Sequence, residues 1–280
     1  MIGVFRPRPS DPHVARRRAV LQGGLPLPEA TGAPITPDAL AGRPSAPPGR
    51  DGLLRADLAE PLSTERFLAF GDGLGKPLPE SDPFVLPWVE HGVVLNLVDE
   101  YAHPEDPARQ PFSAAALTLH SERSDRAVAA QPRYVVLMCC AADPAERLAQ
   151  TVLVPMASVH DALTPDERRV LAATRCRSDH DVPPILRYVQ GRPVFAFRDL
   201  GDAPFRWVCP DGAASPAEVD GALRALLAAM YQPRNATGIR WRRGTLAVID
   251  NTFSFHGRSA AGAARRPRRR HLKRLRIRHP

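Results

Sequence analysis

Short apolar runs bounded by turn residues dominate the middle and the end of the chain. These runs are partly β-branched and too short for ordinary helices, so they predict strands. They are VVLNLV (93–98), AAALTLH (114–120), RYVVLMCC (133–140), TVLVPM (151–156), PVFAF (193–197) and GTLAVID (244–250). A last run, RRHLKRLRI, predicts a final strand in which Arg270, Leu272 and Arg274 share one face.

Two segments predict helices that begin with a capping box. Thr164 and Glu167 precede RRVLAAT, and Ser215 and Glu218 precede VDGALRALLAAMY, with a proline in the first turn of both. A shorter helical stretch around residues 63–70 leads into GDGLG, which is expected to be a turn because no strand–helix context for a phosphate loop surrounds it. Many strands with few helices predict a mainly β (α+β) fold, a sandwich or barrel with flanking helices packed outside.

The first fifty residues are rich in Pro, Gly and Ala and show no sustained period, which predicts an irregular N-terminal arm over residues 1–50. Residues 51–280 are expected to form a single domain around one core. No run approaches the ~18 apolar residues of a membrane span, and the start lacks the apolar core of a signal peptide. The four cysteines show no CxxC spacing, so a cytoplasmic protein with reduced thiols is expected.

The net charge of +8 is concentrated at one end of the chain. Residues 257–280 hold ten Lys and Arg and no acidic residue. The remainder has 28 basic and 30 acidic residues, a net charge of about −2. Because the excess is confined to one terminus, the composition argues against a broad nucleic-acid-binding face, and a small-molecule partner is the better expectation.

The chemistry of the chain centres on His120-Ser121-Glu122 at the end of a predicted strand. Alternation along a strand would turn His120 and Glu122 to one face. His256, which follows the buried run GTLAVID, is the candidate partner. Two histidines and one carboxylate form the facial triad of non-haem Fe(II) oxygenases, which leaves coordination positions open for a bidentate co-substrate and O₂.

Arginines of the final strand fit such a site. A 2-oxo acid that chelates iron through its keto and C1 carboxylate oxygens keeps a distal carboxylate, and a guanidinium is the natural bidentate partner of that group. Arg270 or Arg274 could supply it. The same His₂Glu set could also hold catalytic zinc, although the sequence contains no HExxH helix.

HSE at 120–122, the threonine of AQTVLVP, the run GTLAVIDNTFSFHGRS and RRHLKR together resemble the clavaminate synthase-like group of Fe(II)/2-oxoglutarate oxygenases. That group belongs to the TauD-like superfamily and includes amino-acid β-hydroxylases that act on arginine or asparagine. The motifs span residues 112–276. The resemblance implies a double-stranded β-helix, or jelly roll, with Fe(II), 2-oxoglutarate and O₂ as cofactors and an amino acid or an amino-acid-derived natural-product intermediate as substrate.

The resemblance also implies roles for individual residues. His120, Glu122 and His256 match the iron ligands, and Arg270 matches the arginine that pairs with the distal carboxylate of 2-oxoglutarate. The other matches are Thr151 on the same carboxylate, Arg274 near the co-substrate or the substrate, and Asn251, Gly257 and Arg258 as supporting residues.

Three other functions remain open from the sequence. A nucleic-acid dealkylase would use the same iron chemistry with the basic terminus on phosphates, a zinc hydrolase would ignore 2-oxoglutarate, and a jelly-roll binding protein would have no activity. Acidic residues of the predicted loops could meet a cationic substrate amine, and these are Asp179, Asp181, Asp199 and Asp202.

Overall fold

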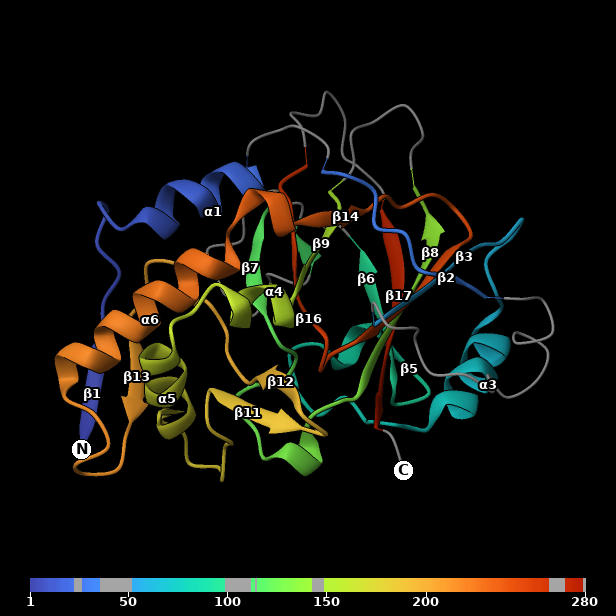
Figure 1. Cartoon of the computed structure of the whole chain (residues 1–280). Helices are drawn as coiled ribbons and strands as arrows, with labels where there is room; N and C mark the ends of the chain where they lie inside the picture. The colour runs from blue at the N-terminus through green and yellow to red at the C-terminus, as the bar shows by residue number, and fades with distance from the viewer. Residues whose placement is uncertain are drawn as a thin grey trace.

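The computed structural model of the protein describes residues 1–22, 27–35, 52–98, 112–113, 115–142, 149–261 and 270–278. Its apolar runs pair into two mainly antiparallel sheets that face each other, with helices outside them (Figure 1). This is the mainly β jelly-roll fold with flanking helices that the sequence predicts.

The larger sheet has eight strands in the order β2-β3-β15-β8-β17-β6-β5, with β4 paired to β17. Its pairings are antiparallel except for that of β2 with β3. The strands are β2 (Ala33–Pro34), β3 (Leu53–Asp57), β4 (Lys76–Pro77), β5 (Val89–Glu90), β6 (Val94–Val98), β8 (Tyr134–Ala141), β15 (Thr245–Asp250) and β17 (His271–Arg278).

The smaller sheet has four antiparallel strands in the order β14-β9-β16-β7. They are β7 (Leu117–His120), β9 (Thr151–Pro155), β14 (Thr237–Ile239) and β16 (Ser254–Arg258). A three-stranded sheet and a hairpin lie beside it. Their strands are β1 (Ile2–Phe5), β13 (Phe205–Val208) and β10 (Arg175–Cys176), and β11 (Leu186–Val189) and β12 (Arg192–Phe195).

Helices cover the outer face of each sheet, on opposite sides of the molecule (Figure 1). Helix α3 (Thr64–Leu74) packs Phe67 and Phe70 against the outer face of the larger sheet. The smaller sheet packs its outer face into the cluster that contains the remaining helices. These are α1 (Pro12–Gln22), α4 (Met156–Asp161), α5 (Pro165–Ala173) and α6 (Pro216–Met230), and the 3₁₀ turns are η1 (Leu86–Trp88), η3 (Val128–Ala130) and η4 (Pro233–Asn235).

A third apolar layer fills the space between the two sheets. Leu137 and Leu272 of the larger sheet meet Leu153 of the smaller one and Trp241, which follows β14. Because neighbours in a strand alternate faces, Leu272 and every second residue after it in β17 point into this layer. Leu275 and Ile277 point to α3 instead. The candidate site lies between the two sheets, where β17 of the larger sheet faces β7 and β16 of the smaller one.

The predicted strands and helices are confirmed with small shifts of their ends. Both capping boxes form, at Thr164 with Glu167 and at Ser215 with Glu218. The prediction of a turn at GDGLG is wrong, because α3 continues to Leu74. Gly71 allows α3 to pack closely against β17, since a Cβ there would lie 2.7 Å from a methyl group of Leu275.

The prediction of an irregular arm is wrong for its first part, where β1 and α1 form. Helix α1 has no clear apolar stripe, and it is held by buried Val20 and Leu21 near its end and by contacts of its arginines. Arg16 donates to the carbonyl of Ala228, and Arg17 pairs with Asp199. Residues 23–26 and 36–50 of the expected arm lie outside the described residues. Within the described ranges, none of the helices has the length and apolar character needed to cross a membrane.

Candidate metal centre

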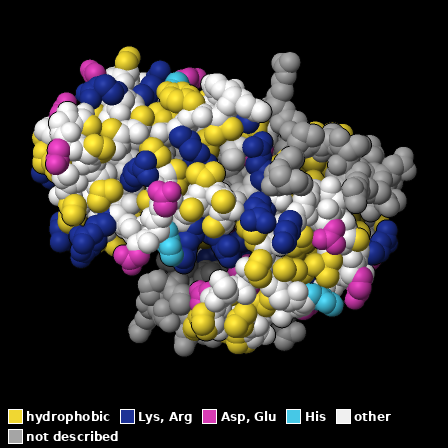
Figure 2. Space-filling view, turned by 90° about the horizontal axis from the view of Figure 1, so that it is seen from below, with side chains coloured by type: hydrophobic (Ala, Val, Ile, Leu, Met, Phe, Trp, Pro, Cys, Tyr) yellow, Lys and Arg dark blue, Asp and Glu magenta, His cyan; other side chains and the backbone are white. Residues whose placement is uncertain are grey.

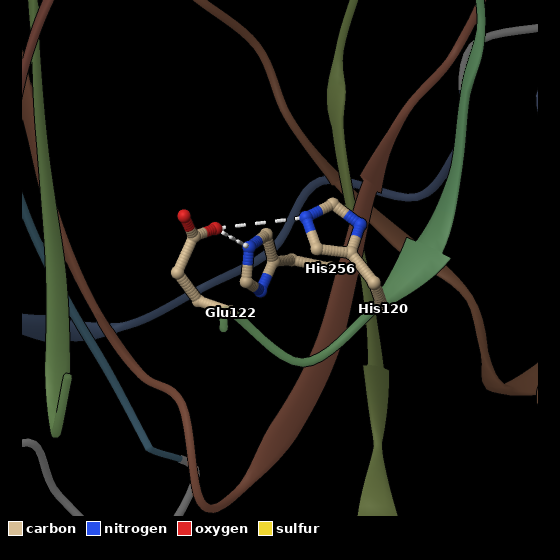
Figure 3. Close-up of side chains that lie close together, drawn as sticks. All are labelled: His120, Glu122 and His256. Atoms are coloured by element: carbon tan, nitrogen blue, oxygen red, sulfur yellow. Dashed lines mark hydrogen bonds and ion pairs between the residues drawn. The ribbon is translucent and has the colours of Figure 1, made fainter. Parts of the chain in front are cut away.

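Two neighbouring strands of the smaller sheet bring His120 and His256 together. His120 ends β7, His256 lies in the middle of β16, and the two are register partners. A Cβ at Gly257 would lie 2.7 Å from the Leu117 carbonyl oxygen, so glycine permits this close approach of the strands. The centroids of the two imidazole rings are 4.5 Å apart (Figure 3).

Glu122 reaches the histidines from a turn and not from the strand. β7 ends at His120, and Arg123 has a left-handed backbone with φ of 54°. Asn251 fixes this turn, since its Oδ1 accepts from the Glu122 N–H at 2.7 Å and its Nδ2 donates to the Glu122 carbonyl at 3.2 Å. The expectation that strand alternation sets His120 and Glu122 on one face is therefore wrong, and the clamped turn brings the carboxylate to the histidines instead.

The three side chains converge on one point. Oε2 of Glu122 lies 3.3 Å from Nε2 of His256 and 3.6 Å from Nε2 of His120. One ligand atom from each residue lies within 4.8 Å of the others, and all three residues are buried. Metal–ligand bonds of about 2.1 Å at right angles would place the donor atoms roughly 3 Å apart. The donor set therefore fits one metal ion bound on one face.

Hydrogen bonding leaves the correct nitrogen of His120 free for a metal. Nδ1 lies 2.8 Å from the carbonyl oxygen of Thr118. A carbonyl only accepts, so Nδ1 carries the proton and Nε2 offers its lone pair toward Glu122. Burial, followed by the neighbouring His256, lowers the pKa of His120 to about 4. The imidazole is thus neutral and available as a ligand.

The second oxygen of Glu122 is held by arginines of β17. Arg276 contacts Oε1 through Nε at 2.7 Å and Nη2 at 2.5 Å, and Arg274 lies 3.7 Å from the same oxygen. Burial alone would raise the pKa of the Glu122 carboxyl, but Arg276 and Arg274 outweigh it and keep that pKa well below the ordinary value. Glu80 bridges the two guanidiniums, at 2.9 Å from Arg274 and 2.7 Å from Arg276.

Two residues of this network were missed by the sequence reasoning. Arg276 lies two positions after Arg274 on the same strand face, so the period of two could have found it. Glu80 comes from the segment after β4 and follows no local pattern. Arg274, which was expected near the co-substrate or the substrate, lies in this network beside the triad.

The residues proposed for 2-oxoglutarate lie in the buried interior. Arg270 immediately precedes β17 and is 1% exposed, close enough to the Cys139 thiol for its charge to act on that group. Thr151 is buried on β9, opposite Arg258 of β16, and its Oγ1 accepts a hydrogen bond from the Trp241 indole at 3.1 Å.

Much of the basic terminus is thus interior and not a surface arm, since Arg258 and Arg270 are buried. Arg274 and Arg276 are mostly buried, with side chains 13% and 14% exposed. Arg258 donates to the Ala115 carbonyl. Four further arginines of this terminus lie outside the described residues, and these are Arg265, Arg266, Arg268 and Arg269.

A second polar network supports β7 from the helical side. The Tyr231 hydroxyl donates to Asp199 at 2.7 Å and accepts from the Leu119 N–H. Thr118 donates its hydroxyl to the Asp199 carbonyl, and Arg17 of α1 pairs with the Asp199 carboxylate at 3.3 Å. Burial, followed by Asp199, raises the pKa of Tyr231 well above its ordinary value. The network links α1 to the strand that carries His120.

Solved structures of several oxygenases share this fold. An asparagine oxygenase in complex with Fe(II), 3-hydroxyasparagine and succinate is 21% identical over 86% of this chain and 78% of its own, with a TM-score of 0.60. PvcB from Pseudomonas aeruginosa is 21% identical over 81% and 75% of the two chains, with a TM-score of 0.57. OrfP in complex with Fe and α-ketoglutaric acid is 16% identical over 82% and 76%, with a TM-score of 0.59.

No curated protein sequence is significantly similar to this chain. The family model described as "Taurine catabolism dioxygenase TauD, TfdA family" matches residues 53–276, which is most of the sequence and includes every member of the triad. The chain therefore belongs to the TauD/TfdA family of Fe(II)/2-oxoglutarate-dependent dioxygenases.

Proposed function

We propose that this dioxygenase oxidises an unactivated C–H bond of an amino acid or of an amino-acid-derived natural-product intermediate, with His120, Glu122 and His256 as the ligands of Fe(II). Hydroxylation is the expected outcome, and desaturation or ring closure are its variants. The observation that carries the proposal is that two Nε2 atoms and one carboxylate oxygen, from two segments far apart in the sequence, face one point.

When bound, Fe(II) with 2-oxoglutarate and O₂ supplies an oxidant strong enough to break such a bond, with succinate and CO₂ as the other products. The chain's own residues orient the reactants and exclude water. Arg276 and Asn251 hold Glu122, and the Thr118 carbonyl holds His120. Arg270 would pair with the distal carboxylate of 2-oxoglutarate, with Thr151 donating its hydroxyl to the same group while it accepts from Trp241.

An amino-acid substrate is supported by the solved structures of this fold. One contains hydroxyasparagine and another contains (3S)-hydroxy-L-arginine. Burial of the basic residues Arg258 and Arg270 weakens the alternative of a nucleic-acid dealkylase, because buried guanidiniums do not contact phosphates. The four cysteines are free thiols, which supports the proposed cytoplasmic location.

Anaerobic addition of Fe(II) and 2-oxoglutarate tests the proposal. A weak visible charge-transfer band should appear for the wild type, vanish for His120→Ala and weaken for Arg270→Ala. Arg206→Gln is the matched control, because Arg206 is an exposed residue of β13, in the separate three-stranded sheet. A wild-type protein that binds zinc and gives no band with Fe(II) and 2-oxoglutarate would support the hydrolase alternative and contradict the proposal.

A further inference from the structure

Arg123 is a half-buried guanidinium beside the triad with no carboxylate of its own. It follows Glu122 directly, and its Nη2 donates to the Pro79 carbonyl at 3.2 Å. Within the described part of the chain, no carboxylate lies within 4.0 Å of it. Glu80 and Glu122 act on Arg123 only from beyond ion-pair distance, so among the described residues this arginine has no directly paired carboxylate.

Arg187 repeats this pattern on the other side of the same turn. It lies on β11, and its Nη2 reaches only Oε1 of Gln131 at 3.4 Å, while its Nη1 is buried without a hydrogen-bond partner among the described residues. Gln131 donates in turn to the Arg126 carbonyl. Arg123 therefore begins the segment 123–131 that follows Glu122, and Arg187 contacts Gln131 at its other end. Burying an unpaired charge is costly unless a ligand compensates it.

The described carboxylates closest to the triad are already engaged. Arg274 and Arg276 pair with Glu80 and Glu122, and exposed Asp125 pairs with Arg126. Arg270 is proposed to pair with the distal carboxylate of 2-oxoglutarate. Among the described residues, no carboxylate forms an ion pair with Arg123 or Arg187. On the face seen from below, Lys and Arg side chains gather around a hollow (Figure 2), and Figure 1 shows β11 at this lower side.

Three of the four carboxylates that could receive a substrate amine are engaged elsewhere, and the fourth, Asp179, is exposed. Asp199 is held by Tyr231 and Arg17, on the helical side of β7. Asp202 also pairs with Arg17, and Asp181 pairs with Arg175. The expectation that these residues meet a cationic amine therefore finds no support for Asp181, Asp199 and Asp202.

We propose, on the basis of the function proposed above, that the substrate enters as an anion: an acidic amino acid, or a derivative of one, whose additional carboxylate binds Arg123 and Arg187. An amide or a basic side chain at the same position would leave both guanidiniums unpaired. Selectivity for charge should therefore exceed selectivity for size at this end of the substrate.

The test uses the anaerobic Fe(II)·2-oxoglutarate complex of the full-length protein, since a substrate that binds beside the iron shifts the charge-transfer band. Aspartate is titrated against asparagine, and glutamate against glutamine, because each pair is nearly isosteric and differs in charge; arginine and lysine complete the set. The acids should bind about ten- to a hundredfold more tightly than their amides. Arg123→Gln and Arg187→Gln should each reduce this preference, and Arg206→Gln should keep it.

Each other outcome has a defined meaning. Equal or tighter binding of the amides or the basic amino acids would overturn the inference and leave the proposed function standing. The same holds if no acid shifts the band at millimolar concentration, or if the acids bleach the band by displacing 2-oxoglutarate. Absence of the band before any amino acid is added would overturn the proposed function, and this inference with it.

Discussion

Arg276 contacts one oxygen of Glu122, and the other oxygen of the same carboxylate faces both histidines. Because Oε1 is engaged by a guanidinium, only Oε2 remains for a metal ion. The arginine would therefore leave Glu122 a single oxygen for a metal ion, which would keep positions open for a bidentate co-substrate.

Replacing Arg276 with glutamine should weaken metal binding. The substitution removes a positive charge near the site, which favours the metal, but it also frees the carboxylate to rotate. We expect the loss of orientation to prevail, with an affinity about ten- to a hundredfold lower, as for other residues that hold metal ligands. Anaerobic calorimetry with Fe(II) or Co(II) measures it. Tighter binding by the variant would show that Arg276 only competes for the carboxylate.

Asn251→Ala should lower both stability and metal affinity. The variant leaves the Glu122 N–H without its acceptor in a buried turn, which costs about 1–3 kcal/mol of unfolding free energy. Denaturant unfolding measures this cost, and titration with metal measures the second effect. Asn235→Ala is the control, because the Asn235 side chain makes no hydrogen bond with the described residues. Unchanged metal affinity in Asn251→Ala would mean that the turn holds its shape without the clamp.

Gly257→Ala should push apart the strands that carry the two histidines. The new methyl group would lie 2.7 Å from the Leu117 carbonyl oxygen, so β7 or β16 must move. We expect a loss of about 1–3 kcal/mol of stability together with weaker metal binding. Gly221→Ala on α6 is the matched control, since a Cβ there meets nothing within 4 Å and alanine favours a helix. Thermal unfolding measures the stability of both variants. A loss in Gly257→Ala that is absent from Gly221→Ala would assign the effect to the contact between the strands.

Glu90 should contribute stability that depends on pH. Burial raises the pKa of this carboxyl, but hydrogen bonds from Thr64, Lys273 and Asn96 outweigh it and lower the pKa to about 2. Because the folded pKa lies below the ordinary value of 4.5, the contribution is complete above pH 4.5 and is lost as the pH falls toward 2. The side chain is 39% exposed, so solvent screening limits the contribution to about 1 kcal/mol.

Glu90→Gln measures this contribution when its unfolding free energy is compared with that of the wild type across the pH range. The difference should be present at neutral pH and shrink in acid. If the difference in unfolding free energy stays constant with pH, the effect of Glu90 comes from packing and not from its charge.

The sequence allowed prediction of the triad and the sheets, because each depends on a local pattern. His120 and His256 follow apolar runs, and the period of two along β17 identifies its inward face. The geometry at Glu122 was not predictable in this way, since it depends on a left-handed residue and on an asparagine 129 positions away. Glu80 was missed for the same reason, because its partners are distant in sequence.

Helix α1 shows the other limit of sequence patterns. Only Val20 and Leu21 of this helix join the apolar cluster, and its arginines contact a distant carbonyl and a distant carboxylate, so the helix shows little of the apolar period by which a helix is recognised. Composition rich in proline and glycine then suggested an irregular arm.

Arg17 links helix α1 to the polar network behind β7. Removal of residues 1–22 would take away the arginine that pairs with buried Asp199, while Tyr231 and Thr118 would keep their hydrogen bonds to Asp199. Thr118 is also the residue whose carbonyl selects the tautomer of His120. Removal of the N-terminal helix should therefore affect the orientation of the His120 imidazole, which is linked to Asp199 through two hydrogen bonds of Thr118.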